Sequence, residues 1–398
     1  MGWLVVAVLW WQTLWWPQVA TDPIVEGVSA EPRFGEQVIF QAHLRLSVPP
    51  REVVLLISPE GQPPLTVNLT PTAAGQLVYT WNLSGRALTP FSRITYWFQV
   101  RRDDGQVVES ARYQFIYRDD RFEWQELQDG IIQVGWVEGD LAFGRAALLA
   151  AQNGLSKAQS LLEAEPPAPL QIYVYPDIQS LQEALSLSQT PWLAGHASPK
   201  TGIVLVAIPP GPDQVAEMER QIPHEIAHLL QYRLMGEAYE QLPVWLAEGV
   251  ASLAELYPNP DYQRALERAL REDRLLPMQS LCRAFPRETA GAFLAYAQSA
   301  SFVRYLQERF GRSGLTALTR VYQDGRGCEE GVQAGLGIPL MQLEREWQQD
   351  VLGVNVWQRA WRHLWPYLVL GVLITLPVLI SAFLVHPHRS HLPRQEEP

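Results

Sequence analysis

Short runs of alternating apolar and polar residues occupy the chain from residue 24 to about residue 118. Such alternation is typical of β-strands with one buried face, and Pro, Gly and Ser separate the runs. Two of the runs flank Asp103-Asp104-Gly105, a strong signal for a hairpin turn. Because no helical period interrupts the series, we predict an N-terminal all-β sandwich over 24–118.

The pattern changes after residue 120, where apolar strands alternate with helical periods. A small sheet followed by a mostly helical C-terminal half predicts a second domain of the α+β class over 122–352. We predict strands over 131–140, 171–176 and 202–208 and a long helix over 141–165. From Gln214 onward we predict helices, with breaks at Gly236, Pro258, Pro286 and Gly311.

Both ends of the chain are strongly apolar. The start is too short to span a bilayer, so we interpret 1–20 as a signal peptide, with an uncleaved anchor as the alternative. The stretch 366–385 is uncharged and has the length of a membrane helix, and Trp residues crowd its N-terminal border. We therefore predict one C-terminal transmembrane helix, an extracytoplasmic body in the cell membrane, and a short cytoplasmic tail over 386–398.

Composition narrows the class of protein. The 398 residues are 47% apolar and 18% charged, which favours a folded chain of more than one domain. The net charge of −11 argues against nucleic acid as a partner. Cys282 and Cys328 are the two cysteines, and they could form one disulfide or remain two buried thiols. The oligomeric state is left open.

The stretch Gln221-Ile-Pro-His-Glu-Ile-Ala-His-Leu-Leu-Gln231 contains an H-E-x-x-H pattern. On a helix His224 and His228 project from one face, so both imidazoles can bind one metal ion. Glu225 lies one step round the helix and could reach water at the metal. Pro223 predicts that the helix begins or kinks there, since proline disrupts helix interiors.

A third ligand is available further along the chain. Glu248 lies in an apolar segment of small residues, where a lone carboxylate is costly unless it binds a partner such as a metal. We expect the small residues around it, Gly249 among them, to let this helix approach the histidine helix closely. Glu255 could orient a ligating histidine from behind, or it could be a solvated surface carboxylate.

These motifs resemble the gluzincin branch of zinc metallopeptidases, the peptidase MA clan. The resemblance lies in "IPHEIAH" and in the Glu of "LPVWLAEGVASLAE". It implies that His224, His228 and Glu248 bind Zn²⁺ and that Glu225 is the catalytic base. The third histidine of metzincins is absent.

A looser similarity, in the order of elements, covers about 122–350, so the predicted domain 122–352 would be zincin-like. It implies that the strand "GIVLVAI" forms the sheet edge along which a peptide lies. It also favours Tyr296 over Tyr232 as the oxyanion donor, because gluzincins often place a tyrosine after the third ligand. Core packing is the alternative for either tyrosine. The N-terminal sandwich resembles a fibronectin-III or immunoglobulin-like module and is expected to fold alone.

The leading hypothesis is a membrane-anchored extracytoplasmic zinc metallopeptidase that acts on a peptide or protein substrate. The related exopeptidases carry a Gly-x-Met-Glu-Asn run before the zinc helix, and its absence here favours an endopeptidase. A zinc-binding but catalytically inactive surface protein with an adhesion or assembly role is the alternative. A helical interaction protein with an accidental motif is a third hypothesis.

Overall fold

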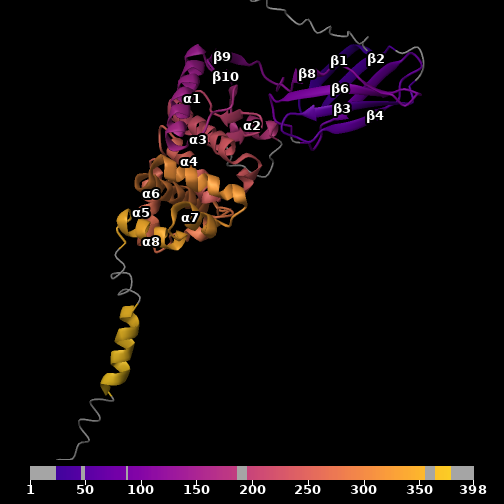
Figure 1. Ribbon diagram of the computed structural model, residues 1–398. Coiled ribbons are helices and arrows are strands. Elements are labelled where there is room, and N and C mark those ends of the chain that lie inside the picture. Colours follow the sequence, from indigo (N-terminus) through magenta and orange to yellow (C-terminus); the bar gives the residue numbers. More distant parts are fainter. Residues whose placement is uncertain (1–23, 46–49, 87, 186–194, 355–363, 378–398) are drawn as a thin grey trace, which may run out of the picture. The chain divides into compact units, whose positions relative to one another are not determined.

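The computed structural model describes residues 24–45, 50–86, 88–185, 195–354 and 364–377 (Figure 1). The predicted signal peptide over 1–20 and the predicted tail over 386–398 lie outside the described residues. Contacts divide the chain into two compact units. The β-rich unit comprises Met1–Gln128, Gln133–Gly144 and Gln171–Pro210, and the helical unit comprises Asp129–Ile132, Arg145–Leu170 and Gly211–Pro398.

Two antiparallel sheets form the N-terminal part of the β-rich unit (Figure 1). One has the order β1-β2-β5; the other has the order β4-β3-β6-β7, and β8 also pairs with β6. The strands are β1 (Val25–Arg33), β2 (Gln37–Leu44), β3 (Glu52–Pro59), β4 (Leu65–Leu69), β5 (Gln76–Asn82), β6 (Arg93–Arg101), β7 (Val107–Glu109) and β8 (Tyr113–Ile116). The predicted hairpin is confirmed, since β6 pairs with β7 around the turn. The sequence analysis named no strand at β1.

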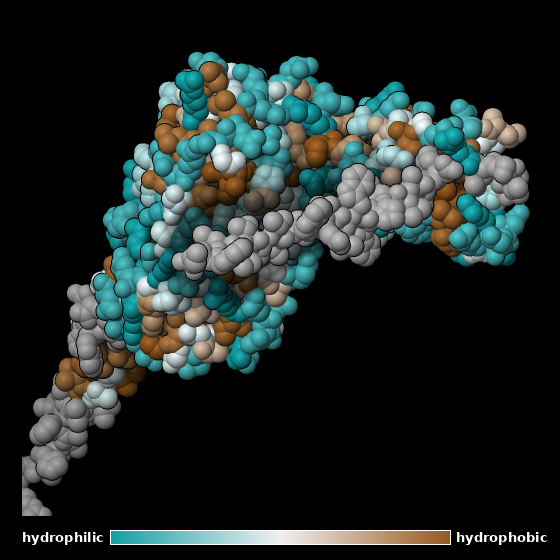
Figure 2. Space-filling model, turned by 45° about the horizontal axis from the view of Figure 1, so that its top comes forward, coloured by the Kyte–Doolittle hydropathy of each residue, from teal (hydrophilic) through white to brown (hydrophobic). Residues whose placement is uncertain are grey.

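Alternating burial along these strands builds one hydrophobic core. In β2 and β3 every second residue is buried, so each strand turns one apolar face inward. Val38, Leu55 and Ile94 come from both sheets and belong to the same buried cluster. Figure 2 shows the complementary result on one face of the molecule, where hydrophilic side chains predominate and separate apolar areas remain.

A third sheet has the strand order β12-β13-β11-β10-β9. Its strands are β9 (Gln125–Asp129), β10 (Ile132–Trp136), β11 (Leu170–Tyr175), β12 (Gly195–Ser198) and β13 (Ile203–Ala207), with helix α2 (Ile178–Ala184) following β11. The predicted edge position of "GIVLVAI" is wrong. All five residues of β13 are buried, and β13 pairs with β11 on one side and with β12 on the other. Burial of both faces explains the all-apolar sequence of β13. Its place in the strand order comes from the pairing with β12, which takes the edge.

The core between the two N-terminal sheets continues into this third sheet within the β-rich unit. The ring of Phe91 stacks on that of Tyr173 with centroids 3.5 Å apart. The fully buried Asp119 accepts hydrogen bonds from Arg121 and from the hydroxyl of Tyr175. Side chains on both sides of residue 118 therefore share one interior, and independent folding of 24–118 stays a prediction.

The helical unit follows the predicted breaks. Its helices are α1 (Leu141–Leu161, whose first residues belong to the β-rich unit), α3 (Gln214–Met235), α4 (Val244–Ala254), α5 (Asp261–Arg271), α6 (Thr289–Arg320), α7 (Cys328–Leu336) and α8 (Leu340–Asp350), with 3₁₀ turns η1 (Gly236–Gln241), η2 (Met278–Leu281) and η3 (Val321–Asp324). Gly236, Pro258 and Pro286 lie outside the α-helices, and Gly311 is non-helical inside α6. The mostly helical C-terminal half is confirmed.

The predicted transmembrane helix over 366–385 is wrong for the described residues, in which no helix is long and apolar enough to cross a membrane. A helix occupies 364–377 there.

Candidate metal centre

Helix α3 carries both histidines of the H-E-x-x-H pattern. It runs unbroken from Gln214 through Pro223, so the helix does not begin at the proline. Pro223 packs against α1 at Gly154, where a Cβ atom would lie 2.6 Å from the proline ring. A glycine at that point lets the two helices pass closely, which offsets part of the cost of an internal proline.

Three side chains from α3 and α4 converge at one point. His224 Nε2 lies 3.3 Å from Glu248 Oε2, and His228 Nε2 lies 3.8 Å from the same oxygen. One ligand atom from each residue lies within 4.8 Å of the others. Zinc–ligand distances of 2.0–2.2 Å at tetrahedral angles would place ligand atoms about 3.4 Å apart. The three predicted ligands therefore have the spacing that a metal ion requires.

The contact between His224 and Glu255 determines which tautomer the His224 imidazole adopts. Its Nδ1 lies 3.1 Å from Glu255 Oε1, which can only accept when ionised. With the proton on Nδ1, the Nε2 lone pair points toward the Glu248 carboxylate. Two acceptors at 3.3 Å repel each other unless a cation or a proton lies between them. This donor set therefore fits a metal ion.

The pKa values of His224 and Glu248 shift in opposite directions because the two side chains attract each other. Burial by itself lowers the pKa of His224, but hydrogen bonds to Glu248 and Glu255 outweigh it and raise the pKa well above 6.5. Burial raises the pKa of Glu248, but His228 and His224 together lower it below 4.5. The shifts favour a protonated imidazole on His224 and an ionised carboxylate on Glu248.

Glu255 lies behind His224 rather than on the surface. Its side chain is only 3% exposed. One oxygen contacts His224, and Oε2 has no hydrogen-bond partner among the described residues. The structure thus brings Glu255 to the position expected of a residue that orients a ligating histidine. The alternative of a solvated surface carboxylate is wrong.

Two contacts to His228 were missed by the sequence analysis. Its Nδ1 lies 3.1 Å from Gln231 Oε1 and 3.0 Å from the Tyr239 hydroxyl on η1. Gln231 follows His228 by three residues, so helical spacing could have indicated it. Tyr239 comes from a different element, and no local pattern pointed to it.

Glu225 and Tyr296 also lie at this centre. Burial chiefly raises the pKa of Tyr296, and the charges of Glu248 and Glu225 raise it further, so the phenol stays protonated. Tyr296 hydrogen-bonds Glu248 in this state. The other candidate, Tyr232, donates to Glu237 at 3.0 Å. Between the two, the geometry places Tyr296 beside the predicted ligands.

The small residue next to Glu248 packs differently from the expectation. A Cβ atom on Gly249 would lie 2.4 Å from Val303 Cγ2 and 2.6 Å from the Ser299 carbonyl oxygen, both on α6. Gly249 therefore permits close packing against α6 and not against the histidine helix. Successive residues of a helix face different directions, so the small residues beside Glu248 do not all face the same neighbouring helix.

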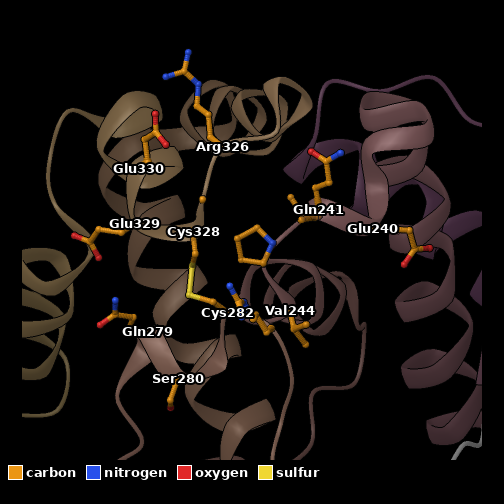
Figure 3. Close-up of a pocket in the computed structure, with 14 residues that line it drawn as sticks. Glu240, Gln241, Val244, Gln279, Ser280, Cys282, Arg326, Cys328, Glu329 and Glu330 are labelled. Atoms are coloured by element: carbon orange, nitrogen blue, oxygen red, sulfur yellow. A yellow bond between two sulfur atoms is a disulfide. The ribbon is translucent and has the colours of Figure 1, made fainter.

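A disulfide between Cys282 and Cys328 lies beside the start of α4 and lines a pocket of about 750 Å³ (Figure 3). The Cys282 carbonyl accepts from the Val244 backbone N–H at 3.0 Å. The Trp245 indole N–H points to the Cys328 sulfur at 3.4 Å. The cross-link thus anchors the first turn of the helix that carries Glu248, and of the two alternatives the disulfide is the one formed.

Two histidines on one helix and a glutamate on the next, with a carboxylate beside the first histidine, are the features of a metallopeptidase site. A model of the Peptidase MA superfamily matches residues 150–353, just over half of the chain. The chain therefore belongs to the Peptidase MA superfamily. This membership confirms the metallopeptidase class and implies a metal cofactor.

Solved structures with some similarity include zinc metallopeptidases. An M1 zinc metallopeptidase from Deinococcus radiodurans is 15% identical, with 80% of this chain and 91% of that chain covered and a TM-score of 0.36. An aminopeptidase N family protein from Idiomarina loihiensis is 10% identical, with 82% and 73% covered and a TM-score of 0.37. A search of curated proteins finds no match.

Proposed function

We propose that this chain is a zinc-dependent peptidase in which His224, His228 and Glu248 hold the metal and Glu225 is the general base. The observation that carries the proposal is the convergence of three ligand atoms within 4.8 Å of one another. Imidazole nitrogens with one carboxylate form a donor set suited to zinc, and three protein ligands leave one position for chemistry. Glu225 supports catalysis over a structural site, because a structural zinc site requires no such base.

Zinc bound here would supply Lewis acidity, which activates water and polarises a peptide carbonyl. Glu225 accepts the proton of the attacking water, and the hydroxyl group adds to the carbonyl carbon. The same carboxyl then gives its proton to the departing amine as the C–N bond breaks. Tyr296 can donate a hydrogen bond to the developing oxyanion, because its raised pKa keeps the phenol protonated. Its present partner Glu248 holds the ring at the centre.

The substrate is proposed to be cut internally. The segment 195–214 comprises β12 and β13 and ends at the first residue of α3, and it contains no glutamate. An aminopeptidase must hold the free α-amine of its substrate, and the related exopeptidases do so with the Gly-x-Met-Glu-Asn run. The absence of the acidic run from this segment supports an endopeptidase.

A single substitution tests the role of the base. Glu225→Gln removes the proton acceptor and leaves the three ligands in place. We expect zinc content to persist and peptide cleavage to fall by about 10²–10⁴-fold. Metal analysis and a fluorogenic peptide assay measure the two quantities on the same sample. Full activity in this variant would remove Glu225 from the mechanism.

Matched peptides test the position of the cut. One peptide is N-acetylated and its partner has a free N-terminus. Mass spectrometry of the products should show the same internal cleavage in both peptides. Stepwise removal of single residues from the free peptide alone would instead identify an aminopeptidase.

We propose that the helical unit works in an oxidising compartment outside the cytoplasm. The Cys282–Cys328 disulfide supports this location, because stable disulfides are rare in reducing cytosol. Protein isolated from its native cells under acid-quenched, reductant-free conditions should resist alkylation at both cysteines. Complete alkylation of both thiols would contradict the proposed location.

A further inference from the structure

Gln231 is fully buried on α3, one helical turn past the histidine that it contacts. Its Oε1 lies 3.1 Å from His228 Nδ1, and its Nε2 donates to the Ala247 carbonyl at 2.9 Å. A buried amide is costly unless both of its ends are bonded. Here both ends are bonded, and they connect two helices. Ala247 directly precedes Glu248, so the amide links one ligand to the neighbour of another.

The chemistry of these contacts determines the tautomer of His228. A backbone carbonyl only accepts, so the end of the Gln231 amide that faces Ala247 must be the NH₂ group. The end that faces His228 is therefore the carbonyl oxygen, which also only accepts. The imidazole proton must then be on Nδ1. This leaves the Nε2 lone pair toward Glu248 Oε2, 3.8 Å away.

Tyr239 contributes to the same nitrogen in a different way. Its hydroxyl oxygen lies 3.0 Å from His228 Nδ1 and can accept the same N–H. A phenol oxygen can also donate, so Tyr239 by itself is compatible with either tautomer. The carbonyl of Gln231 allows one tautomer only. The glutamine is thus the group that makes the choice.

From this geometry we infer that Gln231 is a positioning residue for the metal centre. It holds His228 in the tautomer whose Nε2 binds metal, and it bonds the histidine helix to the Glu248 helix. The inference rests on the metal role proposed for His224, His228 and Glu248. It does not depend on whether the centre cleaves peptides.

The full chain offers a matched control for a test. Gln298 on α6 is also fully buried and also bonds at both ends, in this case to the backbone of Leu276 at 2.8 Å on each side. Gln231→Met and Gln298→Met therefore remove the same chemical group from equally buried sites. If the role of Gln231 were purely structural, both variants would lose thermal stability and their zinc affinities would be equal.

We expect Gln231→Met to weaken zinc affinity by about 10–100-fold and Gln298→Met to leave it unchanged. Competition with a chelating dye measures the affinity, and the visible absorption of the Co²⁺-loaded protein reports the ligand geometry. The Co²⁺ spectrum should change in Gln231→Met only. Equal affinities and equal spectra in the two variants would overturn the inference.

A second variant separates the two ends of the amide and remains informative if Gln231→Met does not fold. Gln231→Glu keeps an oxygen acceptor for His228 and loses the amide donor to Ala247, whose carbonyl then faces a second oxygen that can bond it only when protonated. We expect it to retain most of the zinc affinity, because its carboxylate still holds the Nδ1 proton. Affinity as poor as in Gln231→Met, or lost entirely in a folded Gln231→Glu protein, would contradict the assignment. If the parent protein binds zinc but cleaves no peptide, the peptidase proposal is wrong and the inference about Gln231 still holds.

Discussion

Two buried carboxylates, Asp119 in the β-rich unit and Glu255 in the helical unit, have different surroundings. Asp119 accepts from the Arg121 guanidinium at 2.9 and 2.7 Å and from the Tyr175 hydroxyl at 3.1 Å. Glu255 faces a histidine at 3.1 Å, and its second oxygen has no hydrogen-bond partner among the described residues. One carboxylate is neutralised by a permanent cation and the other is not.

The difference separates a structural cluster from a candidate site. A buried charge with a bidentate guanidinium partner has its charge and its lone pairs satisfied within the protein. Glu248 and Glu255 instead surround His224, whose positive charge depends on a proton or on a metal nearby. A proton on the imidazole or a bound metal ion can balance the carboxylates around His224. The predictions below test this contrast.

The largest effect is expected from Glu248→Ala. Loss of one of three ligands should remove the bound metal and with it the peptidase activity, because two histidines alone leave the tetrahedral site incomplete. Metal analysis after gel filtration measures the loss. A variant that still carries stoichiometric zinc would show that Glu248 is not a ligand and that its burial has another cause.

Asp119→Ala should have the opposite profile. It leaves the buried Tyr175 hydroxyl without its acceptor and removes the two bonds from Arg121, which keeps Glu183 at 3.0 Å. Together these losses cost about 3–5 kcal/mol of unfolding free energy. Zinc content should not change. Denaturant unfolding followed by fluorescence measures the cost, and the exposed neighbour Asp120→Ala is the control, expected within about 0.5 kcal/mol of the parent protein. Equal stability of the two variants would remove the contrast between the units.

Removing the disulfide should destabilise the helical unit by a smaller amount. The double variant Cys282→Ser with Cys328→Ser loses a cross-link between residues 46 apart, worth about 2–4 kcal/mol. Reductant should destabilise the parent protein similarly and leave the double variant unaffected. If reductant destabilises the double variant as well, the effect does not come from this bond.

The smallest effect is expected from Gly249→Ala. The added methyl group would meet Val303 and the backbone of Ser299, and overpacking of this kind costs about 1–3 kcal/mol. Gly211→Ala is the control in the same unit, since nothing lies within 4 Å of its Cβ position. Thermal unfolding of the two variants should differ by several degrees. Identical midpoints would show that the contact between α4 and α6 accommodates the added methyl group without a loss of stability.

Much of the candidate site could be predicted from local spacing. Residues four apart on a helix share a face, so the pattern at His224 and His228 was enough to bring two imidazoles together. Glu248 stood out because a carboxylate in an apolar segment needs a partner. The helix breaks at Gly236, Pro258 and Pro286 followed from the same local chemistry of glycine and proline.

Contacts between distant elements could not be predicted in this way. An apolar strand such as "GIVLVAI" indicates burial, but the order of strands in a sheet depends on pairings that leave no local trace. Gly249 was recognised as a close-packing residue, but its partner depends on which helix lies opposite. Tyr239 contacts His228 from another element, so no periodicity within α3 could indicate it.

The sequence by itself determined which side chains are candidates for the metal centre, because helical spacing and the cost of buried charge are local properties of the chain. Only the tertiary structure decided how those side chains are held. It paired Cys282 with Cys328, placed Glu255 behind His224, and connected Gln231 to the helix of Glu248. Such links join residues far apart in the chain, and their formation depends on the free energy of the whole packed interior rather than on any one segment.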